Sequence, residues 1–268
     1  MSLELTPIVE GKDTGPTIVF IQGWPDDASL WDDAVAAVRD DYRCVRFTLP
    51  NFAGERTTRW GYGTLEIVDA LEKLVRDASR GRPVILVMHD WGCYWGHAVH
   101  HRAPDLVSAV AGLDVAPHYK PTLFAVLNIM AYQWWLLGAF VVGGPIGDGM
   151  TRAFAKIAHT PKQGSQITSW MNYPYRNIWA DIFSGRDQKL QKDYWPTCPL
   201  LFAYGAKKPA HFHSAAWVDH VKKVGGEVIG LPCDHWVTRE PSFAGVLRRW
   251  LDSVAKQPQD KTSRSALN

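Results

Sequence analysis

The stretch that decides the fold is VILVMHDWGCYWGHA, residues 84–98. Its first five residues are apolar and mostly β-branched, which is typical of a buried strand, and helical spacing begins near Cys93. A strand that turns this sharply into a helix holds the side chain at the turn exposed, close to the helix N-terminus. We therefore predict that Asp90 is a nucleophile; the alternative is that it only caps the helix. Met88 stands two residues before it, where a glycine is usual, and predicts a looser or differently packed turn.

Short apolar runs alternate with helical segments on both sides of this turn. Strands are expected at residues 17–21, 44–49, 84–88, 107–113, 200–204 and 227–231, and helices at 29–40, 64–79, 93–103 and 212–224. Such alternation predicts an α/β fold with a mostly parallel sheet and helices on both faces. Residues 117–195 break the rhythm because they hold no convincing strand, and we predict a helical lid insertion there, over the carboxyl ends of the strands.

The chain of 268 residues is long enough to bury a large core. We expect residues 1–116 and 196–255 to form this core, residues 117–195 to form the lid, and the polar tail, residues 256–268, to be disordered. The apolar stretch at residues 121–146 is interrupted by polar residues and glycines. We therefore expect it to line a pocket or the core rather than to span a membrane.

Composition argues against several classes of function. Basic and acidic residues number 29 and 27 and are spread along the chain, so no binding of nucleic acid or of an anionic membrane is expected. The four cysteines lack metal or disulfide spacing, and we expect no metal and no cofactor. The N-terminus lacks a signal-peptide pattern, which predicts a cytoplasmic protein. Thirteen tryptophans suit a pocket for a small hydrophobic substrate, the alternative being a tryptophan-rich core; a homodimer is left open.

A carboxylate nucleophile implies a particular chemistry. It attacks a carbon that carries a leaving group and forms an ester, which water must then hydrolyse, so epoxides and alkyl halides are its natural substrates. Hydrolysis requires a histidine, and His235 has the best position because it follows the last expected strand. The acid that orients this histidine is harder to place. GAKKP, residues 205–209, holds none, and Asp114, which follows the strand at residues 107–113, is the next candidate.

The sequence QGWP, residues 22–25, directly follows the strand expected at residues 17–21. A backbone N–H at this position can face a nucleophile at the top of the sheet. We predict that the N–H groups of Trp24 and Trp91 form an oxyanion hole for the tetrahedral intermediate. The same four residues also fit an ordinary turn.

Together, these motifs resemble the α/β-hydrolase-fold epoxide hydrolases and their dehalogenase relatives over most of the chain. HDWG, residues 89–92, looks like their nucleophile motif, and QGWP looks like their His-Gly-x-Pro motif with glutamine in place of histidine. Fluoroacetate dehalogenases have a similar Leu-Asp-x-x-Pro context after the same strand, which supports Asp114 as the acid. The arginines that follow the nucleophile in those enzymes are missing here, so a small carboxylate substrate is not expected. The resemblance implies the α/β-hydrolase fold.

The resemblance also implies two lid tyrosines, whose hydroxyls bind the epoxide oxygen and protonate it as the ring opens. AYQ, residues 131–133, and MNYPYRN, residues 171–177, look like the two family elements and assign these roles to Tyr132 and Tyr175. Tyr173 is an alternative to Tyr175, because the second element has one added residue. Further substrate-binding side chains are expected in the lid at Gln133, Trp134, Trp170 and Trp179.

The sequence therefore predicts an enzyme that hydrolyses a hydrophobic epoxide to a vicinal diol. A haloalkane dehalogenase with the same nucleophile and base is the first alternative, although dehalogenases commonly have an asparagine where Trp24 stands. A catalytically idle binding protein is the second alternative. It is motivated by Met88, by Gln22 and by the missing acid at residues 205–209.

Overall fold

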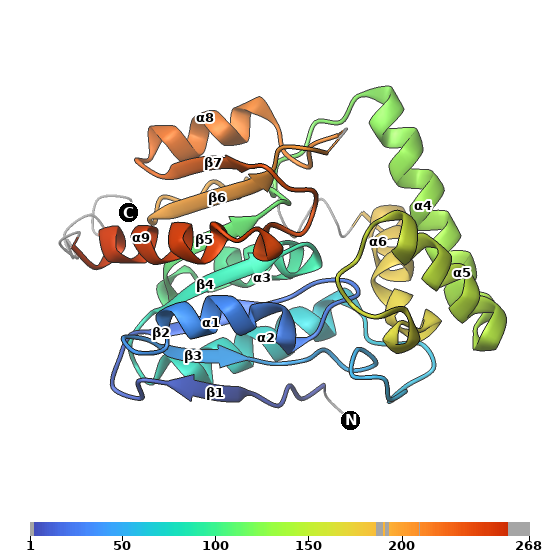
Figure 1. Ribbon diagram of the computed structural model, residues 1–268, viewed down its shortest axis with the longest axis horizontal. Coiled ribbons are helices and arrows are strands. Elements are labelled where there is room, and N and C mark those ends of the chain that lie inside the picture. The colour runs from blue at the N-terminus through green and yellow to red at the C-terminus, as the bar shows by residue number, and fades with distance from the viewer. Residues whose placement is uncertain (1–2, 186–189, 191–192, 209, 257–268) are drawn as a thin grey trace.

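The centre of the molecule is a seven-stranded sheet (Figure 1). A computed structural model describes residues 3–185, 190, 193–208 and 210–256. Within them the strands are β1 (Ile8–Gly11), β2 (Thr17–Ile21), β3 (Arg43–Arg46), β4 (Val84–His89), β5 (Val107–Leu113), β6 (Leu200–Gly205) and β7 (Glu227–Leu231). Their order across the sheet is β1-β3-β2-β4-β5-β6-β7. β1 runs antiparallel to β3, and every other neighbouring pair is parallel.

The predicted α/β fold with a mostly parallel sheet is confirmed, and all six expected strands are present. β3 ends at Arg46, earlier than expected. The sequence analysis did not predict β1. Its four residues are mostly exposed at the edge of the sheet, so they lack the apolar pattern of a buried strand.

Helices cover both faces of the sheet (Figure 1). They are α1 (Asp32–Val38) and α9 (Phe243–Lys256) on one face, and α2 (Thr64–Ser79), α3 (Trp91–Arg102) and α8 (Ala215–Lys223) on the other. In α2, for example, buried apolar residues recur at Ile67, Leu71 and Leu74. This spacing places them on one side of the helix, where the sheet covers them. Of the tail expected to be disordered, only Lys256 lies within the described residues, at the end of α9.

Residues 117–195, which lie between β5 and β6, form a helical insertion that we call the inserted segment. Its longer helices are α4 (Leu123–Val142), α5 (Gly144–Ile157) and α6 (Tyr173–Phe183), and its described residues contain no strand. The Thr122 side chain caps α4 by accepting a hydrogen bond from the Ala125 N–H. α6 lies on the sheet side of α4 and α5 (Figure 1). The boundaries of a separate lid domain stay a prediction.

α4 is the one helix among the described residues that is long and apolar enough to cross a membrane, judged by length and composition alone. The mean hydropathy of its 18-residue window is 1.6, and 22% of that window is buried. Its fully buried side chains are Ala125, Leu136, Ala139 and Phe140. Ten of the twenty residues of α4 are exposed.

Met88 fits before the nucleophile turn because α3 has a glycine opposite it. A Cβ atom on Gly96 would lie 2.1 Å from the Met88 Sδ and 3.2 Å from the Ile21 Cδ1. Met88 itself is fully buried. The turn is therefore differently packed rather than loose: the large residue is on the strand and the small one on the helix.

This packing predicts a coupled effect on stability. Gly96→Ala should lower the free energy of unfolding by about 1–3 kcal/mol, because the added methyl overfills the space beside Met88. In a Met88→Ala background the same change should cost less, since the competing side chain is shorter. Urea unfolding of the wild type, both single variants and the double variant measures this coupling. Equal costs of Gly96→Ala in the two backgrounds would contradict the packing described.

Candidate active site

Asp90 lies at the turn between β4 and α3, with φ 54° and ψ −125°, a conformation that residues other than glycine rarely adopt. Two glycines make room for this turn. A Cβ on Gly92 would lie 2.1 Å from the Ile21 carbonyl oxygen, and a Cβ on Gly23 would lie 2.4 Å from the Asp90 Oδ2. Asp90 stands at the N-cap position of α3, but its side chain makes no capping hydrogen bond to this helix, which disfavours the helix-cap alternative. Its side chain is 17% exposed, which leaves it accessible to a substrate.

The two N–H groups expected to form an oxyanion hole both reach the Asp90 carboxylate. The N–H of Trp24 donates to Oδ2 at 2.8 Å, and the N–H of Trp91 is a further donor. Burial alone would raise the pKa of Asp90, but the adjacent imidazole of His235, the nearby His89 and the Trp91 N–H bring it below its ordinary value. The carboxylate is therefore ionised, and two backbone N–H groups donate to it.

His235, in the loop after β7, lies between two carboxylates. Its Nε2 is 3.3 Å from the Asp90 Oδ1, and its Nδ1 is 2.5 Å from the Asp114 Oδ2. The His89 imidazole donates a hydrogen bond of 2.9 Å to the His235 carbonyl oxygen and so holds the loop. Burial would lower the pKa of His235, but the charges of Asp114 and Asp90 raise it to about 9. At neutral pH the free site therefore holds a protonated imidazole.

Asp114 directly follows β5 and is fully buried. The N–H of Gly205, at the end of β6, donates to Oδ1 at 2.9 Å, while Oδ2 faces His235. The backbone of Asp114 has φ 69°, a second left-handed position at the carboxyl end of the sheet. Burial would raise the pKa of Asp114, but His235 and Lys208 hold it well below its usual range. The structure thus brings three side chains together as in a catalytic triad, with His235 between Asp90 and Asp114.

Lys208 also belongs to this site, and the sequence analysis missed it. Its ammonium forms an ion pair with the Asp114 Oδ2, and its side chain is 8% exposed. The ammonium also lies 4.5 Å from the centre of the Phe212 ring. Burial lowers the pKa of Lys208, and the Asp114 charge opposes this shift. The available signal was its position in the loop after β6, beside the end of β5. An acid was expected in this loop, and Lys208 is a base.

Five aromatic side chains near Asp90 form an aromatic cluster: Trp24, Trp91, Tyr132, Phe154 and Tyr175. Tyr132 and Tyr175 meet at nearly a right angle, with ring centroids 6.0 Å apart. Tyr175 also contacts the indoles of Trp24 and Trp91, at 5.7 and 5.3 Å. Burial raises the pKa of both phenols, and the charge of the nucleophile raises it further. Both hydroxyls are therefore protonated and available as hydrogen-bond donors.

Tyr173, the alternative to Tyr175, points away from this cluster. It is fully buried, and its ring contacts Phe52 and Tyr62 at 5.7 and 6.5 Å. Residues two apart on an α-helix lie on nearly opposite sides, about 200° apart. The position of Tyr173 on the core side of α6 therefore directs Tyr175 toward the nucleophile.

The remaining residues expected to bind substrate are mostly elsewhere. Trp134 is 48% exposed and packs against Trp179, with ring centroids 5.0 Å apart. Trp170 lies 4.0 Å from the Arg56 guanidinium. Among the described rings, none of these three indoles contacts the aromatic cluster. Gln133 is the exception, because its side chain hydrogen-bonds Tyr132.

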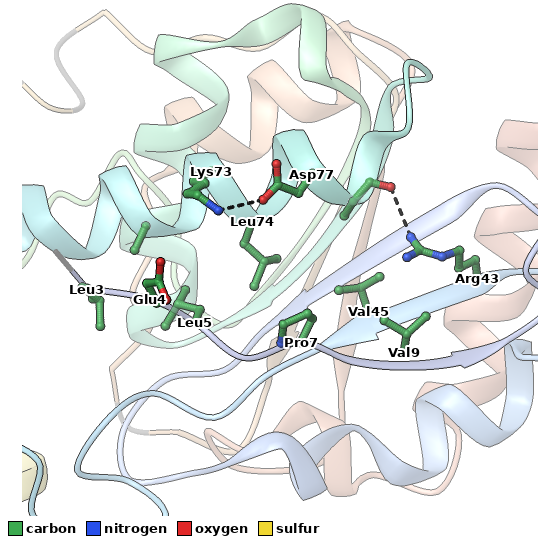
Figure 2. Close-up of a pocket in the computed structure, with 12 residues that line it drawn as sticks. Leu3, Glu4, Leu5, Pro7, Val9, Arg43, Val45, Lys73, Leu74 and Asp77 are labelled. Carbon is green, nitrogen blue, oxygen red and sulfur yellow. Dashed lines mark hydrogen bonds and ion pairs between the residues drawn. The ribbon is translucent and has the colours of Figure 1, made fainter.

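A pocket of about 270 Å³ lies in a different part of the core, between the N-terminal segment, β3 and α2 (Figure 2). Three of its polar side chains already have partners: Lys73 pairs with Asp77 at 3.0 Å, and Arg43 donates to the Ala78 carbonyl oxygen at 3.2 Å. None of the triad or aromatic-cluster residues lines it. This pocket is therefore separate from the candidate active site.

The mostly parallel sheet, with a carboxylate at a strand-to-helix turn and a distant histidine beside a buried acid, agrees with the comparison to known families. A family model described as the alpha/beta hydrolase fold matches residues 16–221. The chain belongs to this family. The expected resemblance to the α/β-hydrolase fold is thus confirmed.

Two curated proteins are similar to parts of the chain. The protein named "Probable oxidoreductase EphD" from Mycobacterium tuberculosis is 29% identical over 109 residues, which are 39% of this chain and 18% of that protein. A cis-3-alkyl-4-alkyloxetan-2-one decarboxylase from Xanthomonas campestris is 30% identical over 145 residues, which are 50% of this chain and 47% of that enzyme. The matched segments thus span less than half the length of these two relatives.

Two solved α/β-hydrolases share the fold over nearly their whole length. Haloalkane dehalogenase DbeA from Bradyrhizobium elkanii has a TM-score of 0.69 at 15% identity, over 95% of this chain and 97% of that one. An epoxide hydrolase from Bacillus megaterium, bound to its naphthyloxy-propane-diol product, has a TM-score of 0.68 at 18% identity, over 92% and 96%. At these identities the likeness concerns the fold alone.

The shared contact with Asp114 predicts that Lys208 affects the titration of His235. Two cations compete for one carboxylate oxygen, so Lys208→Met should strengthen the hold of Asp114 on the imidazolium and move the pKa of His235 upward from about 9. An NMR titration of the imidazole carbons measures this shift. Lys207→Met, at the exposed neighbour, is the matched control and should leave the pKa in place. A shift of the same size in both variants would exclude a specific role of Lys208.

Proposed function

We propose that the protein is an epoxide hydrolase that opens a hydrophobic epoxide to a vicinal diol through an ester on Asp90. The observation that carries the proposal is the pair of phenols beside the nucleophile, with Tyr132 and Tyr175 at right angles and 6.0 Å apart. An alkoxide is a poor leaving group unless it is protonated or strongly hydrogen-bonded as it forms. Two protonated hydroxyls next to a carboxylate meet this requirement.

In the first step, the Asp90 Oδ1 attacks an epoxide carbon. The Oδ2, which accepts from the Trp24 N–H, becomes the carbonyl oxygen of the ester, and the Trp91 N–H is the second donor to this group. The carbon–oxygen bond of the epoxide breaks as Tyr132 and Tyr175 hydrogen-bond the departing oxygen, and one of them transfers its proton to it. The aromatic cluster excludes water from these charges and provides an apolar wall for the substrate.

In the second step, His235 takes a proton from a water molecule whose oxygen attacks the ester carbonyl carbon. The negative charge that forms on Oδ2 is stabilised by the same two N–H groups. Collapse of this intermediate breaks the bond between the ester carbonyl carbon and the diol oxygen, and this oxygen takes the proton from His235 as it leaves. The proton that remains on the new carboxyl group of Asp90 returns to the tyrosinate, which restores the carboxylate and both phenols. Ester formation also prepares the base, because it removes the negative charge of Asp90 and so lowers the pKa of His235 from about 9. Asp114 keeps the imidazole oriented throughout.

A haloalkane dehalogenase would use the same ester but needs N–H donors that point at a halide. The indole of Trp24 does not have this role, because its Nε1 donates to the Asn172 Oδ1 at 2.8 Å. Asn172 is buried and in turn donates to the Thr151 hydroxyl at 2.8 Å. The indole N–H of Trp24 is thus already occupied and is not free to bind a halide, which disfavours the dehalogenase alternative.

The ester should be trapped when the base is removed. His235→Ala incubated with styrene oxide should gain the mass of one epoxide molecule, carried on Asp90, because alkylation needs no base whereas hydrolysis does. Mass spectrometry of the intact protein and of its peptides measures the adduct. The Asp90→Asn/His235→Ala double variant is the control and should stay unmodified. An unmodified His235→Ala mass across a panel of epoxides and alkyl halides would refute both enzyme functions.

The phenols should act on ring opening rather than on ester hydrolysis. Tyr132→Phe and Tyr175→Phe should each lower the single-turnover alkylation rate with an epoxide about 10²-fold, because the leaving oxygen loses a proton donor. Tyr173→Phe is the matched control, since its buried hydroxyl has no hydrogen-bond partner in the described structure. Wild-type alkylation in both site variants, or release of halide from haloalkanes without any diol from epoxides, would favour the dehalogenase instead.

A further inference from the structure

The surface of the inserted segment that faces away from the sheet is unusually apolar. α4 and α5 form the part of the molecule farthest from the strands (Figure 1). Several large apolar side chains on these helices are exposed, some by more than 70%. We call this surface the outer face and define it by Leu123, Phe124, Leu127, Trp134, Ile146 and Ile157.

The outer face follows from the spacing along α4. Leu123, Leu127 and Trp134 are four and seven residues apart, which places them within about 40° of one another around the helix. Tyr132 lies on the opposite side, where it meets the aromatic cluster. α4 contains no charged residue over its whole length. A helix that is apolar all round is normally covered on every side, whereas this one is covered on one side only.

Exposed charges around the outer face are all positive. Between residues 117 and 185, Lys120, Arg152 and Lys156 are exposed beside or on α4 and α5, whereas the exposed Arg176 lies on α6 against the Trp60 carbonyl oxygen. The two carboxylates in this range are not: Asp148 accepts two hydrogen bonds from Ser169, and Asp181 is buried against the Thr64 hydroxyl. The near-neutral charge of the whole chain conceals this local excess. An apolar strip with exposed cations and no exposed carboxylate is complementary to an anionic lipid surface.

We propose that the outer face binds the surface of an anionic phospholipid bilayer, with α4 lying in the plane of the interface. At 1.5 Å per residue α4 is about 30 Å long, and its leucines would enter the acyl boundary while the lysines and arginines meet phosphate groups. Trp134 and Trp135, each nearly half exposed, are suited to the headgroup level. This inference does not depend on the reaction proposed for Asp90.

The same observations argue against the two other ways of covering this face. A two-fold dimer would place the exposed cations of one copy opposite those of the other, with no exposed carboxylate between residues 117 and 185 to pair with them. A span is excluded because Leu136, Ala139 and Phe140 are fully buried against the rest of the molecule. A helix that lies in the plane of the interface can keep these buried contacts, because only its exposed side enters the lipid.

Flotation with lipid vesicles tests the proposal. The wild-type protein should float with vesicles of equal parts phosphatidylglycerol and phosphatidylcholine, and at least about tenfold less with pure phosphatidylcholine. High salt should weaken the binding, because it screens the lysines and arginines. Absence of binding to the anionic vesicles, or equal binding to both kinds, would overturn the proposal without reference to any variant.

Paired variants then locate the surface. Leu123→Ser/Leu127→Ser should lower flotation at least about tenfold, whereas Ile8→Ser/Val9→Ser, at exposed apolar positions of β1, should not. Lys120→Glu/Lys156→Glu should also lower flotation at least about tenfold, whereas the control Lys222→Glu/Lys223→Glu, on α8, should not. Equal losses within either pair would mean that the outer face is not the binding surface. A dimer detected by light scattering that Leu123→Ser/Leu127→Ser abolishes would assign this face to a second copy and would also overturn the proposal.

Discussion

The hydrogen bond between Asp114 and His235 is the contact on which the arrangement of the site depends. It joins the end of β5 to the loop after β7, while the other oxygen of the same carboxylate receives the N–H of Gly205 at the end of β6. One buried side chain thus connects the carboxyl ends of three strands that follow one another in the sheet. A buried carboxylate without such partners would be too costly to keep ionised. His235 and Lys208 supply the positive charge that makes it stable there.

Much of this arrangement could be predicted from the sequence. Alternating apolar runs and helical segments predict a parallel sheet, and the carboxyl ends of parallel strands meet at one edge. Residues that follow such strands, as Asp90, Asp114 and His235 do, are therefore expected to converge even when they are far apart in the chain. The missing acid after β6 was informative in the same way, because it left Asp114 as the remaining candidate at that edge.

The parts that could not be predicted depend on helix rotation and on tertiary packing. Trp134, Trp170 and Trp179 have the composition of a pocket lining, but which side of a helix faces the nucleophile is set by how the inserted helices pack. Lys208 is positively charged, whereas a negatively charged residue was expected in its loop, so the sequence pattern did not point to it. Met88 stands where a glycine is usual, and Gly96 on the facing helix leaves space for its side chain. Such compensation is visible only in three dimensions.

The position of Tyr132 along α4 has a mechanical consequence. It is the tenth of the twenty residues in this helix and therefore lies at its midpoint. If α4 rocks about its centre, the two ends travel several ångströms while the phenol hardly moves; if α4 rolls about its long axis, the ends stay in place and the phenol sweeps past the nucleophile. The centre of the helix thus coincides with the Tyr132 phenol. Tilting motions are tolerated by this design, and rolling is the motion that packing against α6 must prevent.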